Sequence, residues 1–184
     1  ISLGLVGSEM CIRDRCRDSC AQGSEMISIT KLAINLPSPL PELDSFNRYL
    51  FIGPHPDDIE IGAGATAAKL AESGKAVAFL CCIDGRYGSA AVPPEELIPI
   101  RQAEAKASAA ALGVSDVRFL PFCDGGFYDA RELTSALAKV VGDFKPDVIF
   151  CPDPQVKSEC HPDHLNVGKA ASGIAYFALS LIHI

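Results

Sequence analysis

The sequence predicts an α/β fold, a three-layer sandwich in which helices cover both faces of a mostly parallel β-sheet. Short apolar runs alternate about four times with longer helix-forming segments, which is the pattern of repeated strand–helix units. The runs are apolar throughout rather than at every second residue, as expected for strands that are buried on both faces. The chain has 184 residues, enough for one domain with a sizeable core.

The first strand is predicted from a short apolar run, Tyr49 to Ile52, which ends at a Gly-Pro turn. The segment from Ile59 to Ser73 is rich in good helix formers and is followed by Gly74, a typical helix stop. The next run, Ala76 to Ile83, reads AVAFLCCI and predicts a second buried strand.

A long second helix is predicted to begin at Pro93 or Pro94, because proline suits the first helical turn. Glu95 and Glu96 fall in that turn, where acidic side chains suit the helix dipole, and the helix runs to Leu112. The same reasoning predicts four more elements, which are strands at 117–120 and 147–151 and helices at 130–141 and 165–178.

Both ends of the chain differ in character from its centre. Residues 1–15 carry their charges after a short apolar stretch, so they do not fit a targeting peptide. They resemble translated adapter sequence, and so do residues 179–184. We therefore expect an artefactual or disordered leader at 1–25, an extended lead-in at 26–47, and a folded domain at 48–178 from a metagenomic fragment that is truncated at its C-terminus.

Composition excludes several classes of protein. The formal net charge is −7, and without a Lys/Arg cluster the chain offers no electrostatic footprint for nucleic acid or anionic membrane. No apolar run reaches the length that spans a bilayer. The eight cysteines form no C-x-x-C pair, which favours small buried residues in a reducing, cytoplasmic compartment.

Two short polar clusters are the most informative feature. His55-Pro56-Asp57-Asp58 follows the first predicted strand, and His161-Pro162-Asp163-His164 follows the fourth. Ligands of open parallel sheets bind outside the carboxyl ends of the strands. The loops at 84–89 and 121–129 also leave strands there, so we expect four distant segments to meet at one edge.

The two clusters can supply a metal site. Imidazole nitrogen and carboxylate oxygen bind first-row metals, and a catalytic site keeps one position for water. His55 and Asp58 are three residues apart, so one turn can aim both at an ion, and His164 can complete the set. Asp57 is then placed to take a proton from water. His161 can stabilise an oxyanion or protonate a leaving amine.

Each of these residues also has an ordinary structural interpretation. Asp57 and Asp58 can simply cap a helix, and His161 with His164 can be a surface turn. Arg101 is either a solvated charge on its helix or a residue that reaches the substrate. Asp84, Arg86 and Asp124 lie in turn-forming segments, where a substrate-binding role also stays open.

The chain resembles the LmbE-like, or PIG-L, deacetylase family over roughly residues 48–178. The similarity lies in GPHPDDIEIGAGAT (53–66), IDGR (83–86), the helix that starts at 101, FLPFCDG (119–125), KPDVIF (145–150) and HPDH (161–164). It implies a Rossmann-like fold and a zinc-dependent N-deacetylase, although another divalent metal such as Fe²⁺ is compatible with the site. The usual substrates of the family are N-acetylglucosamine conjugates, such as thiol-sugar precursors and glycolipids.

The resemblance also implies a role for each matched position. His55, Asp58 and His164 are the implied metal ligands, and Asp57 is the implied general base. His161 would stabilise the tetrahedral intermediate or serve as the acid, with Asp163 orienting it. Arg101 would contact the sugar or its attached group.

The leading hypothesis is therefore removal of acetate from an N-acetylated amino sugar, a small-molecule substrate, by a protein that can be a homo-oligomer. One rival is a metal-dependent hydrolase of a non-sugar linear amide, because nothing in the residues specifies the sugar. The other is a non-catalytic binding module of the same fold.

Overall fold

The computed structural model describes residues 42–181. The predicted leader at 1–25, most of the predicted lead-in at 26–47, and the last residues of the predicted tail lie outside this part of the chain. The described end of the lead-in contains one 3-10 turn, η1 (Leu43–Ser45), where an extended segment was predicted.

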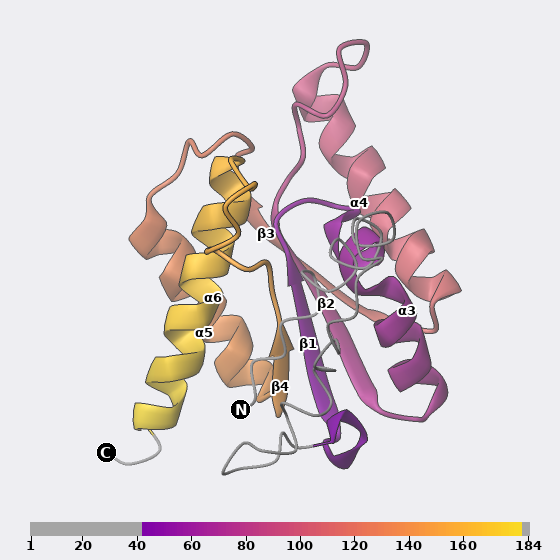
Figure 1. The fold of residues 1–184 in the computed structure, drawn as a ribbon. Helices are drawn as coiled ribbons and strands as arrows, with labels where there is room; N and C mark the ends of the chain where they lie inside the picture. The colour runs from indigo at the N-terminus through magenta and orange to yellow at the C-terminus, as the bar shows by residue number, and fades with distance from the viewer. Residues whose placement is uncertain (1–41, 182–184) are drawn as a thin grey trace, which may run out of the picture.

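Four parallel strands form the sheet, in the order β3-β2-β1-β4. Their bounds are β1 (Arg48–Gly53), β2 (Ala76–Ile83), β3 (Asp116–Phe122) and β4 (Val148–Phe150). The helices are α3 (Asp58–Glu72), α4 (Pro94–Ala111), α5 (Ala130–Phe144) and α6 (Pro162–Leu181). The predicted α/β class is confirmed: α3 and α4 cover one face of the sheet, and α5 and α6 cover the other (Figure 1).

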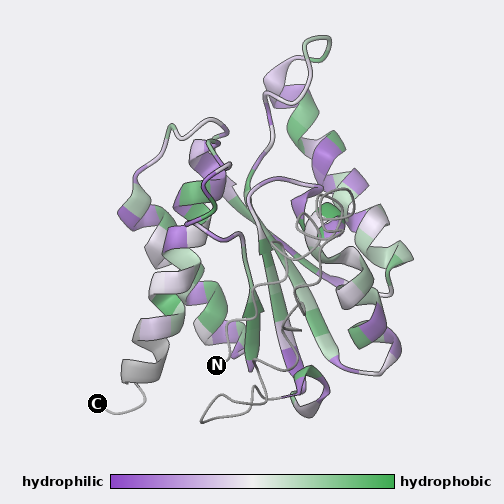
Figure 2. Ribbon diagram, viewed as in Figure 1, coloured by the Kyte–Doolittle hydropathy of each residue, from purple (hydrophilic) through white to green (hydrophobic). Residues whose placement is uncertain are grey.

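The apolar strands explain the three layers. Leu50 and Leu80 are fully buried on the side of the sheet that packs against α5 and α6. Their neighbours Phe51 and Phe79 point the opposite way, into the core formed with α3 and α4. The strands are accordingly hydrophobic along most of their length (Figure 2), because successive side chains alternate between two buried faces.

Several predicted boundaries differ from the structure by a few residues, and two of the differences involve proline. α6 begins at Pro162, whereas the prediction placed the helix start at residue 165. Proline suits the first helical turn because its missing N–H would have no partner there, so most of the second polar cluster is helical. β3 continues through Pro121, which was predicted to lie in a loop. β3 is an edge strand, where a residue without an N–H is tolerated.

The register of the central strands brings the two polar clusters together. β1 pairs with β2 on one side and with β4 on the other. Phe51 of β1 lies beside Phe150 of β4, with stacked rings whose centroids are 4.4 Å apart. Residues 55–58 leave β1 and residues 161–164 follow β4, so both arrive at the same carboxyl edge.

Gly168 lets the loop before the second cluster pack closely against α6. A Cβ at this position would lie 2.6 Å from the main-chain oxygen of Pro152 and 3.2 Å from Cδ of Pro154. A methyl group there would push the loop away from the helix. Gly173, in the same helix, would meet nothing within 4 Å.

Replacement of these two glycines by alanine is therefore expected to change the stability of the protein in opposite directions. Gly168→Ala should lower the free energy of unfolding by about 1–3 kcal/mol, through overpacking. Gly173→Ala should raise it by about 0.5–1 kcal/mol, because alanine is the better residue in a helix interior. Urea unfolding of both variants beside wild type measures the difference. Equal stability of the two variants would contradict the close approach at Gly168.

The remaining general predictions concern the cysteines and the membrane. The five cysteines of the described segment are free: Cys81 and Cys82 are buried, Cys123 and Cys151 are partly buried, and Cys160 is exposed. Burial raises the pKa of the Cys81 thiol to about 12, so this thiol stays protonated. Among residues 42–181, no helix has the length and apolar character needed to cross a membrane.

Candidate metal centre and active site

The first cluster forms a tight turn between β1 and α3. The main-chain N–H of His55 donates to Oδ2 of Asp58 at 2.7 Å, and the N–H of Asp58 donates to the carbonyl of His55 at 3.4 Å. Asp57 occupies the N-cap position of α3, but its side chain makes no capping hydrogen bond. The helix-cap interpretation therefore does not account for the Asp57 carboxylate.

Oδ2 of Asp58 is the atom on which the two clusters converge. It lies 3.2 Å from Nδ1 of His55 and 3.5 Å from Nε2 of His164. A tetrahedral zinc ion with bonds of about 2.0–2.2 Å holds its ligand atoms about 3.3–3.6 Å apart. Ligand atoms of His55, Asp58 and His164 all lie within 4.8 Å of one another, so the three residues fit a metal ion.

His164 is oriented by a carboxylate that the sequence prediction did not assign. Its Nδ1 lies 3.0 Å from Oε2 of Glu159. The other oxygen of Glu159 accepts from the main-chain N–H of His161 at 2.8 Å. With Nδ1 engaged, Nε2 of His164 is left to face Asp58. Many metal-binding histidines have a carboxylate on the second ring nitrogen, which fixes the tautomer.

His55 also meets carboxylates at both ring nitrogens. Its Nε2 lies 3.1 Å from Oδ2 of Asp163 and 3.2 Å from Oδ1 of Asp124. Burial lowers the pKa of His55, but the hydrogen bonds and charges of Asp58, Asp163 and Asp124 outweigh burial and raise the pKa to about 9. The site is therefore strongly attractive to a positive charge.

Asp163 is fully buried and connects the second cluster with the loop after β3. Its Oδ2 accepts from the N–H of Gly125 at 2.8 Å, and its Oδ1 accepts from the hydroxyl of Tyr128 at 2.8 Å. Burial alone would raise the pKa of Asp163, but these bonds and His55 hold it below the ordinary value. A buried carboxylate with this many partners is a stable anion.

His161 lies at the open side of the cluster. Its ring centroid is 5.0 Å from that of His55, and its side chain is 43% exposed. Nδ1 accepts from the main-chain N–H of Asp163 at 3.3 Å, which in the neutral ring places the proton on Nε2. The carboxylate of Asp163 is 3.8 Å from Nδ1, too far for a hydrogen bond, so its orienting role stays a prediction.

Arg101, on α4, reaches the first cluster from the side. Its Nη2 donates to the carbonyl oxygen of Pro56 and, at 2.8 Å, to Oδ2 of Asp57. Its Nη1 donates to Glu104 at 3.1 Å. Arg101 is thus in contact with the candidate base, so the interpretation as a merely solvated charge does not fit.

The other predicted substrate residues divide into two kinds. Asp124 joins the cluster through His55, and its Oδ2 accepts from the N–H of Tyr87 at 3.3 Å. Asp84 is buried, and its carboxylate is held by Arg86 at 2.7 Å. That ion pair fixes the loop after β2. The substrate-binding roles of all three residues stay predictions.

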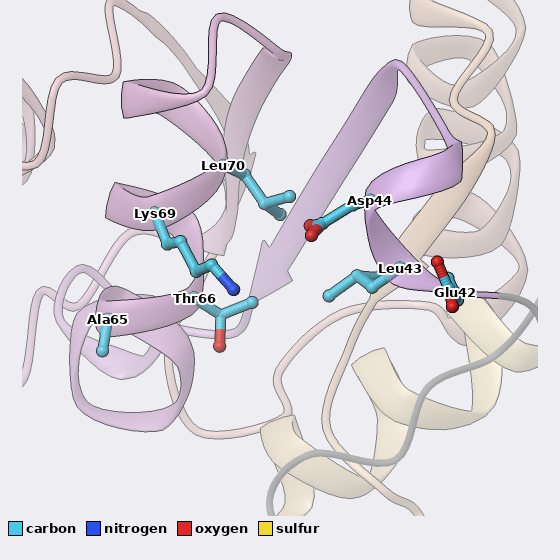
Figure 3. A pocket seen from close by; sticks show the side chains of 7 residues that line it. All are labelled: Glu42, Leu43, Asp44, Ala65, Thr66, Lys69 and Leu70. Atoms are coloured by element: carbon cyan, nitrogen blue, oxygen red, sulfur yellow. The ribbon is translucent and has the colours of Figure 1, made fainter.

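A pocket of about 550 Å³ lies away from this cluster, between η1 and α3. Leu43 and Asp44 face it from one side, and Thr66 and Lys69 of α3 face it from the other (Figure 3). None of its lining residues belongs to either polar cluster. Glu42, the first described residue, also lines this pocket, which is separate from the His/Asp cluster.

Glu159 and Tyr128 are the site residues that the sequence prediction did not find. No sequence pattern marked Tyr128 as a site residue, because its contact with Asp163 joins positions that are 35 residues apart. Glu159 is an acidic residue two positions before His161, and this short spacing was a usable signal. Both contact residues of the second cluster: Glu159 contacts His161 and His164, and Tyr128 contacts Asp163.

The fold and the site together define an α/β domain whose parallel strands present a His/Asp group, suited to a metal ion, at their carboxyl ends. The PIG-L family model, described as GlcNAc-PI de-N-acetylase, matches residues 50–175. The chain belongs to this family, and the predicted resemblance is confirmed.

Individual relatives agree with the family. Diacetylchitobiose deacetylase of Thermococcus kodakarensis is 35% identical over 142 residues, which are 76% of this chain and 52% of that protein. A 1D-myo-inositol 2-acetamido-2-deoxy-alpha-D-glucopyranoside deacetylase of Kineococcus radiotolerans is 33% identical over 164 residues, 71% of this chain and 45% of that protein. The chain therefore spans about half the length of these relatives.

A solved structure confirms the fold. N,N'-diacetylchitobiose deacetylase from Pyrococcus horikoshii, in complex with its inhibitor MPG, superimposes with a TM-score of 0.73 at 32% identity. The match covers 85% of this chain and 60% of that one. The Rossmann-like, LmbE-like architecture predicted from the sequence is the one observed.

Proposed function

We propose that the protein is a zinc-dependent hydrolase that removes the acetyl group from an N-acetylated amino sugar. The observation that carries the proposal is the convergence of His55 and His164 on Oδ2 of Asp58, with the Asp57 carboxylate in the adjoining position. The names of the family and of both relatives support it, because each describes removal of acetyl from a glucosamine unit.

The metal ligands in this proposal are His55, Asp58 and His164. Two imidazoles and one carboxylate are a ligand set that zinc uses in hydrolases, and Fe²⁺ accepts similar ligands. A zinc ion held there would supply Lewis-acid polarisation of the amide carbonyl and would lower the pKa of a coordinated water towards about 7. Asp163 and Glu159 would fix the ring orientations of His55 and His164.

Asp57 is the proposed general base. It takes a proton from the attacking water, whose oxygen adds to the amide carbon. The carbon–nitrogen bond then breaks, and the leaving nitrogen receives the proton that Asp57 took from water, so that the products are acetate and the free amino sugar. Because its Nδ1 accepts from the N–H of Asp163, His161 can donate a hydrogen bond from Nε2 to the developing oxyanion, and it would act as the acid toward the leaving nitrogen only as an imidazolium.

The substrate side of the proposal is less specific. The two relatives are named for diacetylchitobiose and for an inositol 2-acetamido-2-deoxy-glucopyranoside, so an N-acetylglucosamine unit is the shared element. We propose Asp124 as a substrate contact, because it lies directly beside His55. A cytoplasmic location and a homo-oligomer remain predictions.

The test is acetate release by the full chain loaded with Zn²⁺. N-acetylglucosamine and N,N'-diacetylchitobiose should each yield acetate and a free amine in equal amounts, and N-acetylglycine, a non-sugar linear amide, should yield none. Turnover of N-acetylglycine at a rate similar to the sugars would favour the non-sugar hydrolase. Sugar binding without acetate release, at full metal content, would contradict the proposal and favour the binding module.

A chelator should abolish this activity and Zn²⁺ should restore it. Re-addition of Fe²⁺ in the absence of oxygen gives a direct comparison of the two candidate metals on the same preparation. Activity that survives complete removal of metal would also contradict the proposed function.

A further inference from the structure

Asp57 has a backbone conformation that ordinary residues avoid. Its φ is 134° and its ψ is −26°. Within residues 42–181 the other non-glycine residue with positive φ is Lys145, in the common left-handed conformation at a helix end. The conformation of Asp57 costs free energy, and such residues persist only where the surrounding structure holds them.

Arg101 supplies two of the contacts that hold this residue. One nitrogen, Nη2, donates both to the carbonyl oxygen of Pro56 and to Oδ2 of Asp57. The first contact fixes the peptide that enters Asp57, and the second fixes its side chain. A single guanidinium thus bonds to the main chain and the carboxylate on either side of the strained φ torsion.

The loop after β2 also packs against the turn at Pro56 and Asp57. Gly85, with φ of +67°, packs so closely that a Cβ there would lie 3.2 Å from Cδ of Pro56 and 3.9 Å from Nε of Arg101. Pro56 is buried. The turn is therefore enclosed by α4 on one side and by Gly85 on another, and Arg101 is the one charged group that bonds to it from α4.

The contact with Arg101 also makes the two carboxylate oxygens of Asp57 different from each other. Oδ2 is held by Arg101 at 2.8 Å, whereas Oδ1 has no hydrogen bond to any residue in the described part of the chain. The carboxylate is 51% exposed. Oδ1 is therefore the oxygen that can accept a proton from water, in a direction set by the bond at Oδ2.

From these contacts we infer that Arg101 is a positioning residue, which holds Asp57 in the strained conformation that directs its free carboxylate oxygen at the attacking water. The inference rests on the proposed function, in which Asp57 is the base. It assigns to Arg101 a role different from the sugar contact that the family resemblance implies. A sugar contact would act mainly on KM, whereas a positioning residue acts on kcat.

The two variants that test it are Arg101→Ala and Arg101→Lys, in the full zinc-loaded chain with N,N'-diacetylchitobiose as substrate. Arg101→Ala should lower kcat by about 100-fold, because a small misplacement of a reacting group has an effect of that size. KM and zinc content should stay close to wild type. Arg101→Lys should recover only part of kcat, since a point charge cannot reproduce the planar fork of a guanidinium.

The matched control is Glu104→Gln, which removes the other carboxylate partner of Arg101 and leaves Pro56 and Asp57 untouched. Its kcat should stay near wild type. Guanidinium chloride, added to Arg101→Ala below denaturing concentration, should restore part of kcat, which a merely structural loss would not allow. If Arg101→Ala does not fold, Arg101→Lys still decides the question.

The inference would be overturned by a raised KM with unchanged kcat in Arg101→Ala, by full activity of Arg101→Lys, or by failure of guanidinium to rescue a folded Arg101→Ala. The first of these would establish the sugar contact instead. A wild-type protein that releases no acetate would overturn the proposed function and this role with it. An active wild type with an unaffected Arg101→Ala would overturn the role of Arg101 alone.

Discussion

Replacing Asp57 by asparagine is expected to lower kcat for acetate release by about 10²–10⁴-fold, the usual contribution of a general base. Asparagine has nearly the same shape and can still accept a hydrogen bond from Arg101, but it cannot take a proton from water. Asparagine also tolerates positive φ better than most residues, so the turn should keep its conformation. Steady-state kinetics with N,N'-diacetylchitobiose gives kcat and KM separately.

Zinc content decides how this result is interpreted. Asp57→Asn should bind as much zinc as wild type, because Asp57 is outside the His55, Asp58 and His164 set. Glu60→Gln is the control, since Glu60 is also acidic and lies in the first turn of α3. It should leave kcat unchanged. Asp57→Asn with wild-type kcat would remove Asp57 from the mechanism.

Replacing Asp58 by alanine is expected to weaken zinc binding by at least about 100-fold, since even outer partners of metal ligands contribute 10–100-fold. Its Oδ2 is the atom shared by the main-chain N–H of His55 and the ring nitrogens of His55 and His164. Loss of that oxygen removes the negative charge between two histidines and releases the turn as well. Competition with a metal indicator measures the affinity.

Asp58→Asn separates the two effects of that change. The amide oxygen can still accept from the N–H of His55, so the turn should be kept while the negative charge is lost. Zinc affinity should therefore fall in both variants, whereas thermal stability of the metal-free protein should fall mainly in Asp58→Ala. Unchanged zinc affinity in both variants would exclude Asp58 as a ligand.

Much of the fold could be predicted because the local sequence patterns of its strands and helices agree with the places that these elements take in the sheet and its covering layers. The run Ala76 to Ile83 is long, apolar and bounded by turn residues, and the structure has a strand with the same bounds. Helix ends were less predictable. The start of α6 depends on Pro162 being placed in a first helical turn, and nothing local distinguishes that from a proline in the preceding loop.

The residues of the candidate site could be predicted where they belong to short sequence motifs. His55, Asp58 and His164 could be grouped because strand exits of a parallel sheet meet at one edge. The residues that contact the members of these motifs could not be predicted from the sequence. Arg101 contacts Asp57 across 44 positions, and Gly125 contacts Asp163 across 38. Such pairs depend on how α4 and the loop after β3 pack, which no local pattern encodes.

The strand order has a consequence for how the protein folds. β1 and β2 are close in sequence and can pair early, whereas the residues just before β1 and just before β4, such as Asn47 and Asp147, are 100 positions apart. Closing so long a loop is slow compared with local pairing. His55 and Asp58 are therefore expected to reach their places well before His164. Tight binding of zinc by all three would then mark the end of folding, and the rate at which it develops would follow the docking of β4 and α6.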